Sequence, residues 1–370
     1  MKSTENNILN ISSTKCTGCY ACSFVCPQSA ILLKEVDGFR TATVNNQKCI
    51  NCGLCLKVCH RINDEHRTIN DSLAWEAYSN DESVLATSTS GGAAFELSRY
   101  FLKKGYKIVG CKYNYETDCA EHDIIDSESK IYLFTGSKYI QSSLENIKDK
   151  LLDNEKYVFI GTPCQCFGLK KYLNLTKKNS EFVFIDFFCH GFIPADFFTY
   201  FLAKNRKDCL QKIEFRSKER GWHSYLCKMT YKDNYALIPY QKSEFGMVFL
   251  SNFLLLKTCY QCKFRYNQIS SDIRIGDYWG EKHKNNTKGV SCVIGVTENG
   301  KNLLNQFFSK NLMHSNRIDL REIRDAKCGN DNGIKAEPHF NSIFEIVYRM
   351  FGIRVVSLFI KIYLKLRGRI

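Results

Sequence analysis

Two runs of four cysteines near the N-terminus, Cys16 to Cys26 and Cys49 to Cys59, share the spacing C-x2-C-x2-C-x3-C. Three thiolates on one tight loop can bind three irons of a [4Fe–4S] cube, and in this pattern the fourth cysteine of each run binds the other cluster. The sequence therefore predicts two [4Fe–4S] clusters. One is expected to be held by Cys16, Cys19, Cys22 and Cys59, and the other by Cys49, Cys52, Cys55 and Cys26.

The same spacing resembles that of bacterial ferredoxins with two clusters and predicts a ferredoxin-like domain over residues 1–66. Gly18 and Gly53 lie within the two loops, where the backbone must turn and bring N–H groups close to sulfur. Pro27 follows the first run, whereas His60 stands where the second run usually has a proline. The alternative is a zinc site built from paired C-x2-C motifs, which two quadruple runs match poorly.

Nineteen cysteines in 370 residues also limit the compartment and the class of protein. The first ten residues are polar and carry no apolar signal-peptide segment, and the chain is long, unlike small disulfide-stabilised domains. Closely spaced cysteines in a reducing compartment indicate metal ligands, so we expect a cytoplasmic protein. The length predicts two or three domains.

The formal net charge of +14 suits an anionic partner. Negatively charged iron–sulfur clusters offset part of it. The remaining candidates are a phosphate-bearing cofactor, an acidic substrate or a membrane surface. No nucleic-acid-binding motif is present, and we expect no nucleic-acid partner.

Two further segments read as buried strands that each end close to a cysteine. Tyr157–Ile160 leads to Cys164, and Phe182–Phe188 leads to Cys189. Ligands of open α/β sheets bind at this edge, and a C-x2-C pair, Cys259 and Cys262, completes four thiolates. A third [4Fe–4S] cluster is one interpretation, with Cys166 able to replace one member. The other is that these cysteines are buried small hydrophobes, as we expect for the rest: Cys111, Cys119, Cys209, Cys227, Cys292 and Cys328.

Other polar segments allow two interpretations each. A Ser/Gly loop, 87–92, follows a predicted strand at 74–78 and opens a predicted helix at 93–104, before a strand at 107–111. It could bind phosphate or hold a plain N-cap at Ser90. The basic segment 215–223 could clamp phosphate or form a hairpin turn. Residues 276–280 follow a predicted strand at 271–275 and could approach a flat ligand or form a tight turn.

Taken in order, these motifs resemble the beta-subunit family of coenzyme F420 hydrogenases and dehydrogenases. They are SGG, GSKYIQS, GTPCQ, CHG, FR-x-K-x-x-GW, C-x2-C and SDIRIGDYWG, within about residues 74–330. Plant 7-hydroxymethyl chlorophyll a reductase is similar. The resemblance implies an FAD-binding iron–sulfur core, divided into an N-terminal domain at 74–150 and a C-terminal domain at 151–330. It assigns the third cluster to Cys164, Cys189, Cys259 and Cys262.

The resemblance also implies which residues bind FAD, although it singles out no catalytic residue. They lie in two loops, 88–92 and 136–142: Ser88, Ser90, Gly91, Gly92, Gly136, Ser137, Lys138, Gln141 and Ser142. Lys138 would neutralise a flavin phosphate or the reduced flavin anion. Relatives of this kind tend to lie among bacterial polysaccharide-biosynthesis genes, which implies a site of action near the membrane.

The C-terminal segment, 335–370, differs in character from the rest. Apolar residues fill 340–366 and are interrupted by Arg349, Arg354, Lys361 and Lys365. No apolar stretch approaches the roughly 20 residues that span a bilayer. The tail is expected to be an amphipathic helix, lying either on an anionic membrane or on the protein core or a partner, with its basic side in water.

These observations predict a mixed α+β or α/β protein: a ferredoxin-like domain, a flavin- and iron–sulfur-binding core and a helical tail. The expected function is that of an oxidoreductase relaying electrons between a ferredoxin-like donor, the clusters and FAD. Its small-molecule substrate would be F420-like or a polysaccharide-pathway intermediate. The alternatives are a non-catalytic electron-transfer subunit that binds a hydrogenase or dehydrogenase partner, and a redox sensor.

Overall fold

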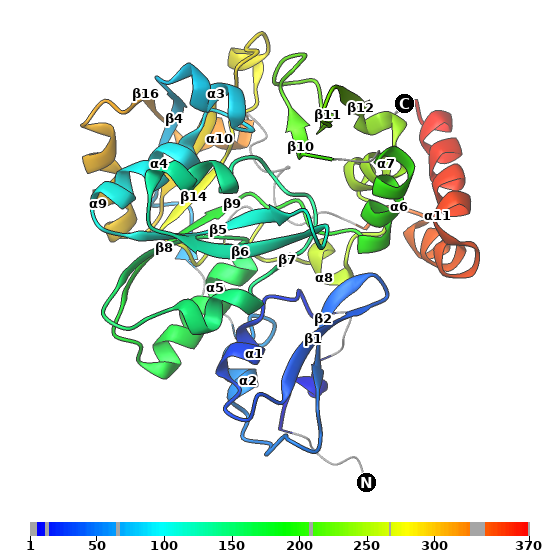
Figure 1. Cartoon of the computed structure of the whole chain (residues 1–370), viewed down its shortest axis with the longest axis horizontal. Helices are drawn as coiled ribbons and strands as arrows, with labels where there is room; N and C mark the ends of the chain where they lie inside the picture. Colours follow the sequence, from blue (N-terminus) through cyan, green and yellow to red (C-terminus); the bar gives the residue numbers. More distant parts are fainter. Residues whose placement is uncertain are drawn as a thin grey trace.

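The computed structural model describes residues 6–11, 15–63, 67–206, 210–265, 268–325 and 337–368. The ferredoxin-like domain lies at one end, beneath a large mixed sheet in the view of Figure 1, and the C-terminal helix lies along one side. The predicted fold class is confirmed.

The ferredoxin-like domain consists of a hairpin and short helices. Strands β1 (Ile31–Val36) and β2 (Phe39–Val44) pair antiparallel. Helices α1 (Ala21–Val25) and α2 (Leu54–Lys57) each follow a cysteine loop, and a 3-10 turn, η1 (Ile8–Asn10), precedes them. Gly18 and Gly53 have φ values of 68° and 74°, a backbone conformation that glycine adopts without strain.

Nine strands of the described residues form one sheet in the order β16-β4-β15-β14-β9-β8-β5-β6-β7. The neighbours β5, β8, β9 and β14 run parallel, whereas β4, β15 and β16 pair antiparallel at one side. The bounds are β4 (Leu73–Ser79), β5 (Lys107–Asn114), β6 (Cys119–Ile125), β7 (Ser142–Ser143), β8 (Lys156–Ile160), β9 (Glu181–Phe187), β14 (Ile273–Asp277), β15 (Ser291–Gly295) and β16 (Met313–Ile318).

Successive side chains of the central strands point to opposite faces of the sheet, and both faces are covered by other elements. In β8, Tyr157 and Phe159 pack with helix α5 (Pro163–Thr176) and the ferredoxin-like domain, whereas Val158 packs on the opposite face. That opposite face is covered by α4 (Ala93–Lys103) and α9 (Glu298–Phe308). Successive side chains of a strand point to opposite faces, so a continuous apolar run is the pattern of a strand buried on both sides.

A second apolar core, rich in phenylalanine, lies beside the sheet. It is built from a three-stranded sheet and three helices, which lie at the right of Figure 1. These are β10 (Lys212–Ser217), β11 (Leu226–Thr230), β12 (Tyr235–Pro239), α6 (Ala195–Asn205), α7 (Glu244–Ser251) and α11 (Asn341–Leu366). The shorter elements are α3 (Glu82–Thr87), α8 (Lys257–Tyr260), α10 (Leu320–Asp325), η3 (Glu128–Phe134), η4 (Glu145–Lys150), η5 (Tyr240–Lys242) and η6 (Glu281–His283).

Two segments have structure that their local sequence did not predict. β3 (Arg67–Thr68) precedes the expected strand at 74–78 and pairs with β13 (Gln268–Ile269). The basic segment 215–223 spans the end of β10 and the turn towards β11, so the interpretation as a hairpin turn fits residues 218–223, whereas Arg216 is buried in the strand. In both cases a long-range partner decides the structure. The expected boundaries at residue 66 and at 330–335 fall outside the described residues.

Candidate functional site

The two N-terminal cysteine runs surround two separate cavities. One cavity is lined by Cys16, Cys19, Cys22 and Cys59, and the second by Cys26, Cys49, Cys52 and Cys55. Each set therefore contains three cysteines of one run and the last cysteine of the other. The structure brings the eight cysteines together in the two groups that the spacing predicts.

Backbone and side-chain N–H groups point at several of these sulfur atoms. The amide of Ala30 donates to Cys26 Sγ at 3.3 Å, and the amide of Ala42 donates to Cys16 Sγ at 3.5 Å. The side-chain amide of Asn7 approaches Cys49 Sγ at 3.8 Å. Such donors stabilise negative charge on thiolate ligands and tune the reduction potential of a bound cluster.

A third cavity lies between the ferredoxin-like domain and the central sheet. Cys164, Cys189, Cys259 and Cys262 line it together with Thr258 and Arg265. Cys164 lies in the first turn of α5, Cys189 follows β9, and Cys259 lies in α8. Three segments that are far apart in the chain thus bring four thiols to a single cavity.

The sequence Gly161-Thr162-Pro163-Cys164-Gln165 explains the position of Cys164. Thr162 caps the N-terminus of α5, Pro163 takes the first helical position, and Gln165 completes a capping box with Thr162. The Thr162 amide donates to Gln165 Oε1 at 3.0 Å. The N-terminus of a helix carries partial positive charge, which stabilises thiolates and an anionic cluster.

The chemistry of the cysteine side chains fits iron–sulfur clusters. Burial raises the pKa of Cys19 to about 12, that of Cys59 to about 11 and that of Cys189 to about 11. Crowded, buried thiolates form when a metal compensates their charge. Arg265 adds a buried positive charge at the third cavity, and its Nη1 has no hydrogen-bond partner among the described residues.

The geometry differs from that of a site for a single ion. Among the described residues, no three His, Cys, Asp or Glu side chains lie close enough to bind one metal ion. Each cysteine around a [4Fe–4S] cube binds a different iron, so its sulfur atoms stand farther apart than those around zinc.

The first and third cavities are neighbours. Thr17, His60 and Arg61 line both of them. Thr17 Oγ1 and His60 Nε2 lie 3.0 Å apart in a buried hydrogen bond, and the His60 ring lies 5.5 Å from that of Phe264. The residue that replaces the usual proline therefore stands between two cysteine sets.

A glycine in α5 permits this close approach of the two domains. A Cβ atom on Gly168 would lie 2.7 Å from the Ala21 side chain and 3.3 Å from Cys19 Sγ. Glycine in a helix interior costs about 1 kcal/mol relative to alanine, and here it lets α5 lie against the first cysteine loop.

The remaining cysteines lie apart from the three cavities. Cys166 is fully buried, with its thiol near the carbonyls of Gly161 and Ile185 at 3.7 and 3.6 Å. It does not line the third cavity. Cys227 and Cys292 are buried in apolar cores, and Cys111 and Cys119 are partly buried. Cys209 and Cys328 lie outside the described residues.

The two loops expected to bind flavin meet in the structure. The Ser137 amide donates to Thr89 Oγ1 at 2.9 Å, which joins 136–142 to 88–92. The hydroxyl of Ser90 donates to the Val290 carbonyl at 2.7 Å, so Ser90 does not cap α4. Gly92 is the N-cap residue of α4, and Ser88 is the C-cap residue of α3. Gly91 packs too closely on β4 and β15 to carry a side chain.

Three other loop residues make different contacts. The Lys138 ammonium donates to the carbonyls of Phe134, Thr135 and Gly136 at 3.2, 2.8 and 3.0 Å, and burial lowers its pKa to about 8. Gln141 accepts from the Arg40 amide at 2.8 Å and donates to the Thr17 carbonyl at 3.1 Å, so it joins the ferredoxin-like domain to the core. Ser142 accepts from Gln165 at 3.0 Å.

A buried arginine of the basic segment 215–223 lies beside these loops. Arg216 Nη1 donates to Asp277 at 2.6 Å, and the guanidinium lies 4.6 Å from the Trp279 ring centre. Its Nε and Nη2 are buried without a hydrogen-bond partner among the described residues. Lys218, two residues on, donates to the Ser90 carbonyl at 2.6 Å. Free donors of this kind fit an anionic or carbonyl-bearing ligand, which is the chemistry of a flavin.

The rings of residues 276–280 pack on the protein itself. Trp279 stacks on Trp222 with centroids 4.4 Å apart, and Tyr278 is buried. Of the two interpretations offered for this segment, the described contacts fit the turn that carries core aromatic residues.

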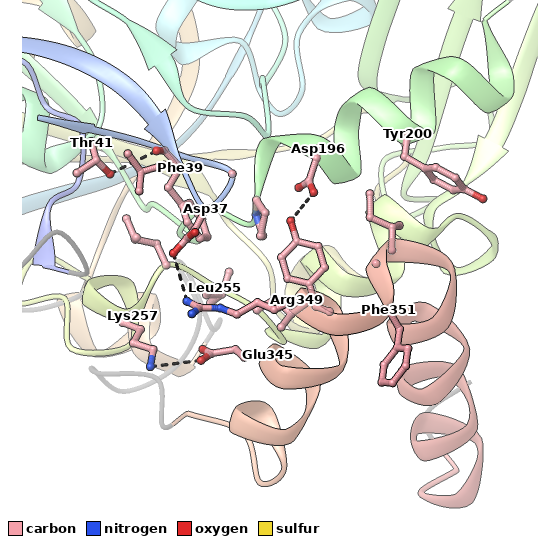
Figure 2. A pocket seen from close by; sticks show the side chains of 18 of the residues that line it. Asp37, Phe39, Thr41, Asp196, Tyr200, Leu255, Lys257, Glu345, Arg349 and Phe351 are labelled. Carbon is pink, nitrogen blue, oxygen red and sulfur yellow. Dashed lines mark hydrogen bonds and ion pairs between the residues drawn. The ribbon is translucent and has the colours of Figure 1, made fainter. Parts of the chain in front are cut away.

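A more open cavity of about 910 Å³ lies elsewhere, between the β1–β2 hairpin, α6 and α11. Figure 2 shows its polar side chains joined in pairs, Asp37 with Arg349 and Lys257 with Glu345. None of the residues predicted to bind a cluster or flavin lines it. The candidate site is therefore the group of cysteine cavities and the loops beside them.

The fold and the cysteine cavities define an iron–sulfur electron-transfer protein. Residues 15–61 match the 4Fe-4S dicluster domain, and residues 154–321 match the C terminus of the coenzyme F420 hydrogenase/dehydrogenase beta subunit. The C-terminal part of the large domain is thus similar to the coenzyme F420 hydrogenase/dehydrogenase beta subunit, and the N-terminal domain is similar to 4Fe-4S dicluster domains.

Two further comparisons were made. Among solved structures, the chain is similar to one in the xenon-derivatised F420-reducing [NiFe] hydrogenase complex from Methanosarcina barkeri, with 15% identity and a TM-score of 0.49. That similarity covers 79% of this chain and 91% of the other. No curated protein sequence is significantly similar to this chain.

Proposed function

We propose that this chain is an iron–sulfur flavoprotein oxidoreductase. The two N-terminal cysteine sets would hold two [4Fe–4S] clusters, Cys164, Cys189, Cys259 and Cys262 a third, and loops 88–92 and 136–138 one FAD. When bound, the clusters supply single-electron transfer, and the flavin joins it to two-electron chemistry on a small molecule. The domain division at 1–66, 74–150, 151–330 and 335–370 is part of this proposal.

The observation that carries the proposal is the adjacency of the first and third cavities, which share Thr17, His60 and Arg61. A domain that only stores or senses electrons does not need a buried link of this kind to a second cysteine set. Residues at the link hold the two sets in place: Gln141 bonds to Arg40 in β2 and to Thr17 in the first cysteine loop, and Thr17 bonds to His60.

The substrate would be a small molecule that carries negative charge. Arg216 offers two buried N–H donors without an acceptor among the described residues, and Lys138 and Lys218 add two half-buried ammonium groups beside the same loops. An F420-like deazaflavin or an anionic intermediate of polysaccharide synthesis fits this chemistry. The second candidate is a subunit without its own substrate that docks on a hydrogenase or dehydrogenase subunit, and the match of residues 154–321 to the C terminus of such a beta subunit favours it.

Cofactor content tests the proposal directly. We expect the chain, purified and reconstituted without oxygen, to contain about twelve irons and twelve sulfides per chain and one acid-released FAD. About eight irons with no flavin would support only the two clusters of the dicluster domain and would contradict both the third cluster and FAD. A change of the flavin spectrum on adding F420 or a candidate substrate, without a partner protein, would separate the enzyme from the subunit.

Flavin binding by Lys138 is tested by a matched pair of variants. Lys138→Met is expected to lower bound FAD at least tenfold, because its ammonium is a half-buried positive charge where two loops meet. Gln141→Ala should retain FAD, because both ends of the Gln141 amide bond to the N-terminal domain. The measurement is flavin per chain after gel filtration. Equal FAD in Lys138→Met and wild type contradicts the role of Lys138, and loss in Gln141→Ala places this residue at the flavin instead.

A further inference from the structure

Helix α11 is apolar on both its inner and its outer face. Towards the protein, Val356, Ile360 and Leu364 are 0–3% exposed and belong to the phenylalanine-rich core. Away from it, Leu358 and Ile362 are 56% and 49% exposed. A helix that is apolar all round is expected to be covered on every side. The outer face is therefore an exposed apolar surface that needs a partner.

The first part of the helix continues the same surface. Gly352, with φ of 75°, kinks α11, and before the kink Ile343, Ile346 and Met350 are 52%, 57% and 67% exposed. Phe351 is 60% exposed at the rim of the open cavity, where Figure 2 labels it. We call Ile343, Ile346, Met350, Phe351, Leu358, Phe359, Ile362 and Leu366 the outer stripe.

The helix is held firmly by its other side. Tyr348 donates a hydrogen bond to Asp196, and Arg349 and Glu345 form ion pairs with Asp37 and Lys257 at 3.3 Å each. These contacts tie α11 to the β1–β2 hairpin and to α6, as Figure 2 shows. The outer stripe is consequently presented by a fixed helix, placed at the margin of the molecule in Figure 1.

Basic side chains lie within the outer stripe. Arg354, Lys361 and Lys365 are exposed at positions three or four residues from Leu358 or Ile362. The acidic residue of the described helix, Glu345, is paired with Lys257. The described residues contain no helix that is both long and apolar enough to cross a bilayer.

We propose that the outer stripe of α11 docks on the surface of an anionic lipid bilayer. Lysine is depleted from the cores of protein–protein interfaces, whereas Lys361 and Lys365 lie among the apolar residues of the stripe. Long basic side chains beside apolar ones are the pattern of an interfacial helix, since their ammonium groups reach lipid phosphates while the stems and apolar neighbours enter the acyl boundary. Because basic and apolar side chains share the outer face of α11, a lipid surface fits this face better than a protein partner does.

Vesicle flotation of the full, iron-loaded chain tests this proposal. We expect the chain to float with vesicles of phosphatidylcholine and phosphatidylserine, and to stay in solution with phosphatidylcholine vesicles. Lys361→Gln with Lys365→Gln should lower the partition coefficient about 30-fold, from the usual effect of two basic residues at an anionic surface. Leu358→Gln with Ile362→Gln should abolish flotation.

Matched control variants lie elsewhere on the surface. Leu152→Gln with Leu175→Gln changes leucines that are 54% and 38% exposed, and this pair should float like wild type. Iron per chain should be equal in all variants, which shows that the fold is retained. Wild type that stays in solution with anionic vesicles, or outer-stripe variants that float unchanged, overturns the proposal. A concentration-dependent dimer that Leu358→Gln with Ile362→Gln converts to monomer, without lipid binding, assigns the stripe to self-association and overturns it as well.

Discussion

Cys164→Ala is expected to reduce the iron content of the reconstituted chain by about four atoms and to leave the dicluster domain loaded. Cys164 lies at the third cavity, where it is buried, and its removal leaves three thiols for four irons. Electron paramagnetic resonance of the reduced protein, together with iron and sulfide analysis, measures the loss. Turnover with a reduced donor and a small-molecule acceptor should fall at least a hundredfold if the third cluster lies on the path of the electrons.

Cys166→Ala is the matched control for this experiment. Cys166 lies two residues away in the same helix and is fully buried, but its thiol bonds to the carbonyls of Gly161 and Ile185 instead of lining the cavity. We expect it to retain all the iron. If iron were lost in Cys166→Ala and retained in Cys164→Ala, Cys166 would replace Cys164 in the proposed ligand set. Full iron content in both variants would contradict the presence of a third cluster.

Asp186→Ala is expected to destabilise the chain by about 3–5 kcal/mol, because it leaves a buried arginine charge without its carboxylate. Arg274 Nε and Nη2 donate to the two oxygens of Asp186 at 2.7 and 2.8 Å, and both side chains are 0% exposed. The pair joins the parallel strands β9 and β14 in the centre of the sheet. The midpoint of urea unfolding, followed by circular dichroism with the clusters bound, measures the change.

An exposed ion pair supplies the comparison for Asp186→Ala. Glu281 and Lys284 form a contact of 2.9 Å with side chains 88% and 64% exposed. Exposed pairs contribute little to stability, so Glu281→Ala should leave the midpoint unchanged. Equal midpoints for Asp186→Ala and wild type would show that Arg274 finds compensation elsewhere.

Cysteine spacing and strand patterns were enough to predict where the cysteines gather. The spacing within the runs at 16–26 and 49–59 predicts that the last cysteine of each run joins the first three of the other. The structure groups the eight cysteines around two cavities in this way. Tyr157–Ile160 and Phe182–Phe188 were predicted as strands from their apolar sequences, and β8 and β9 confirm them. Because parallel strands end at the same edge, the positions of Cys164 and Cys189 could be inferred as well.

What the sequence could not predict depends on contacts between distant segments. Gln141 lies in a motif that resembles a flavin loop, yet its partners are Arg40 and Thr17, more than 100 residues earlier. Arg216 was expected on a loop, and its burial follows from its partner Asp277, 61 residues later. Nothing in the local sequence of either residue identifies its partner. His60 was recognised as a departure from the usual proline, but its position between two cavities follows from docking against α5 and Phe264.

The second cysteine cavity and the junction of the two candidate flavin loops are formed by different residues. Cys52 lines that cavity and is exposed next to Ile50, which is 61% exposed, whereas the hydrogen bond between Thr89 and Ser137 makes the junction. Under the proposed function, a donor protein that binds at Cys52 would leave the junction open to a small molecule. Steady-state kinetics would then follow a ternary-complex scheme, and donor and acceptor would not compete for one site.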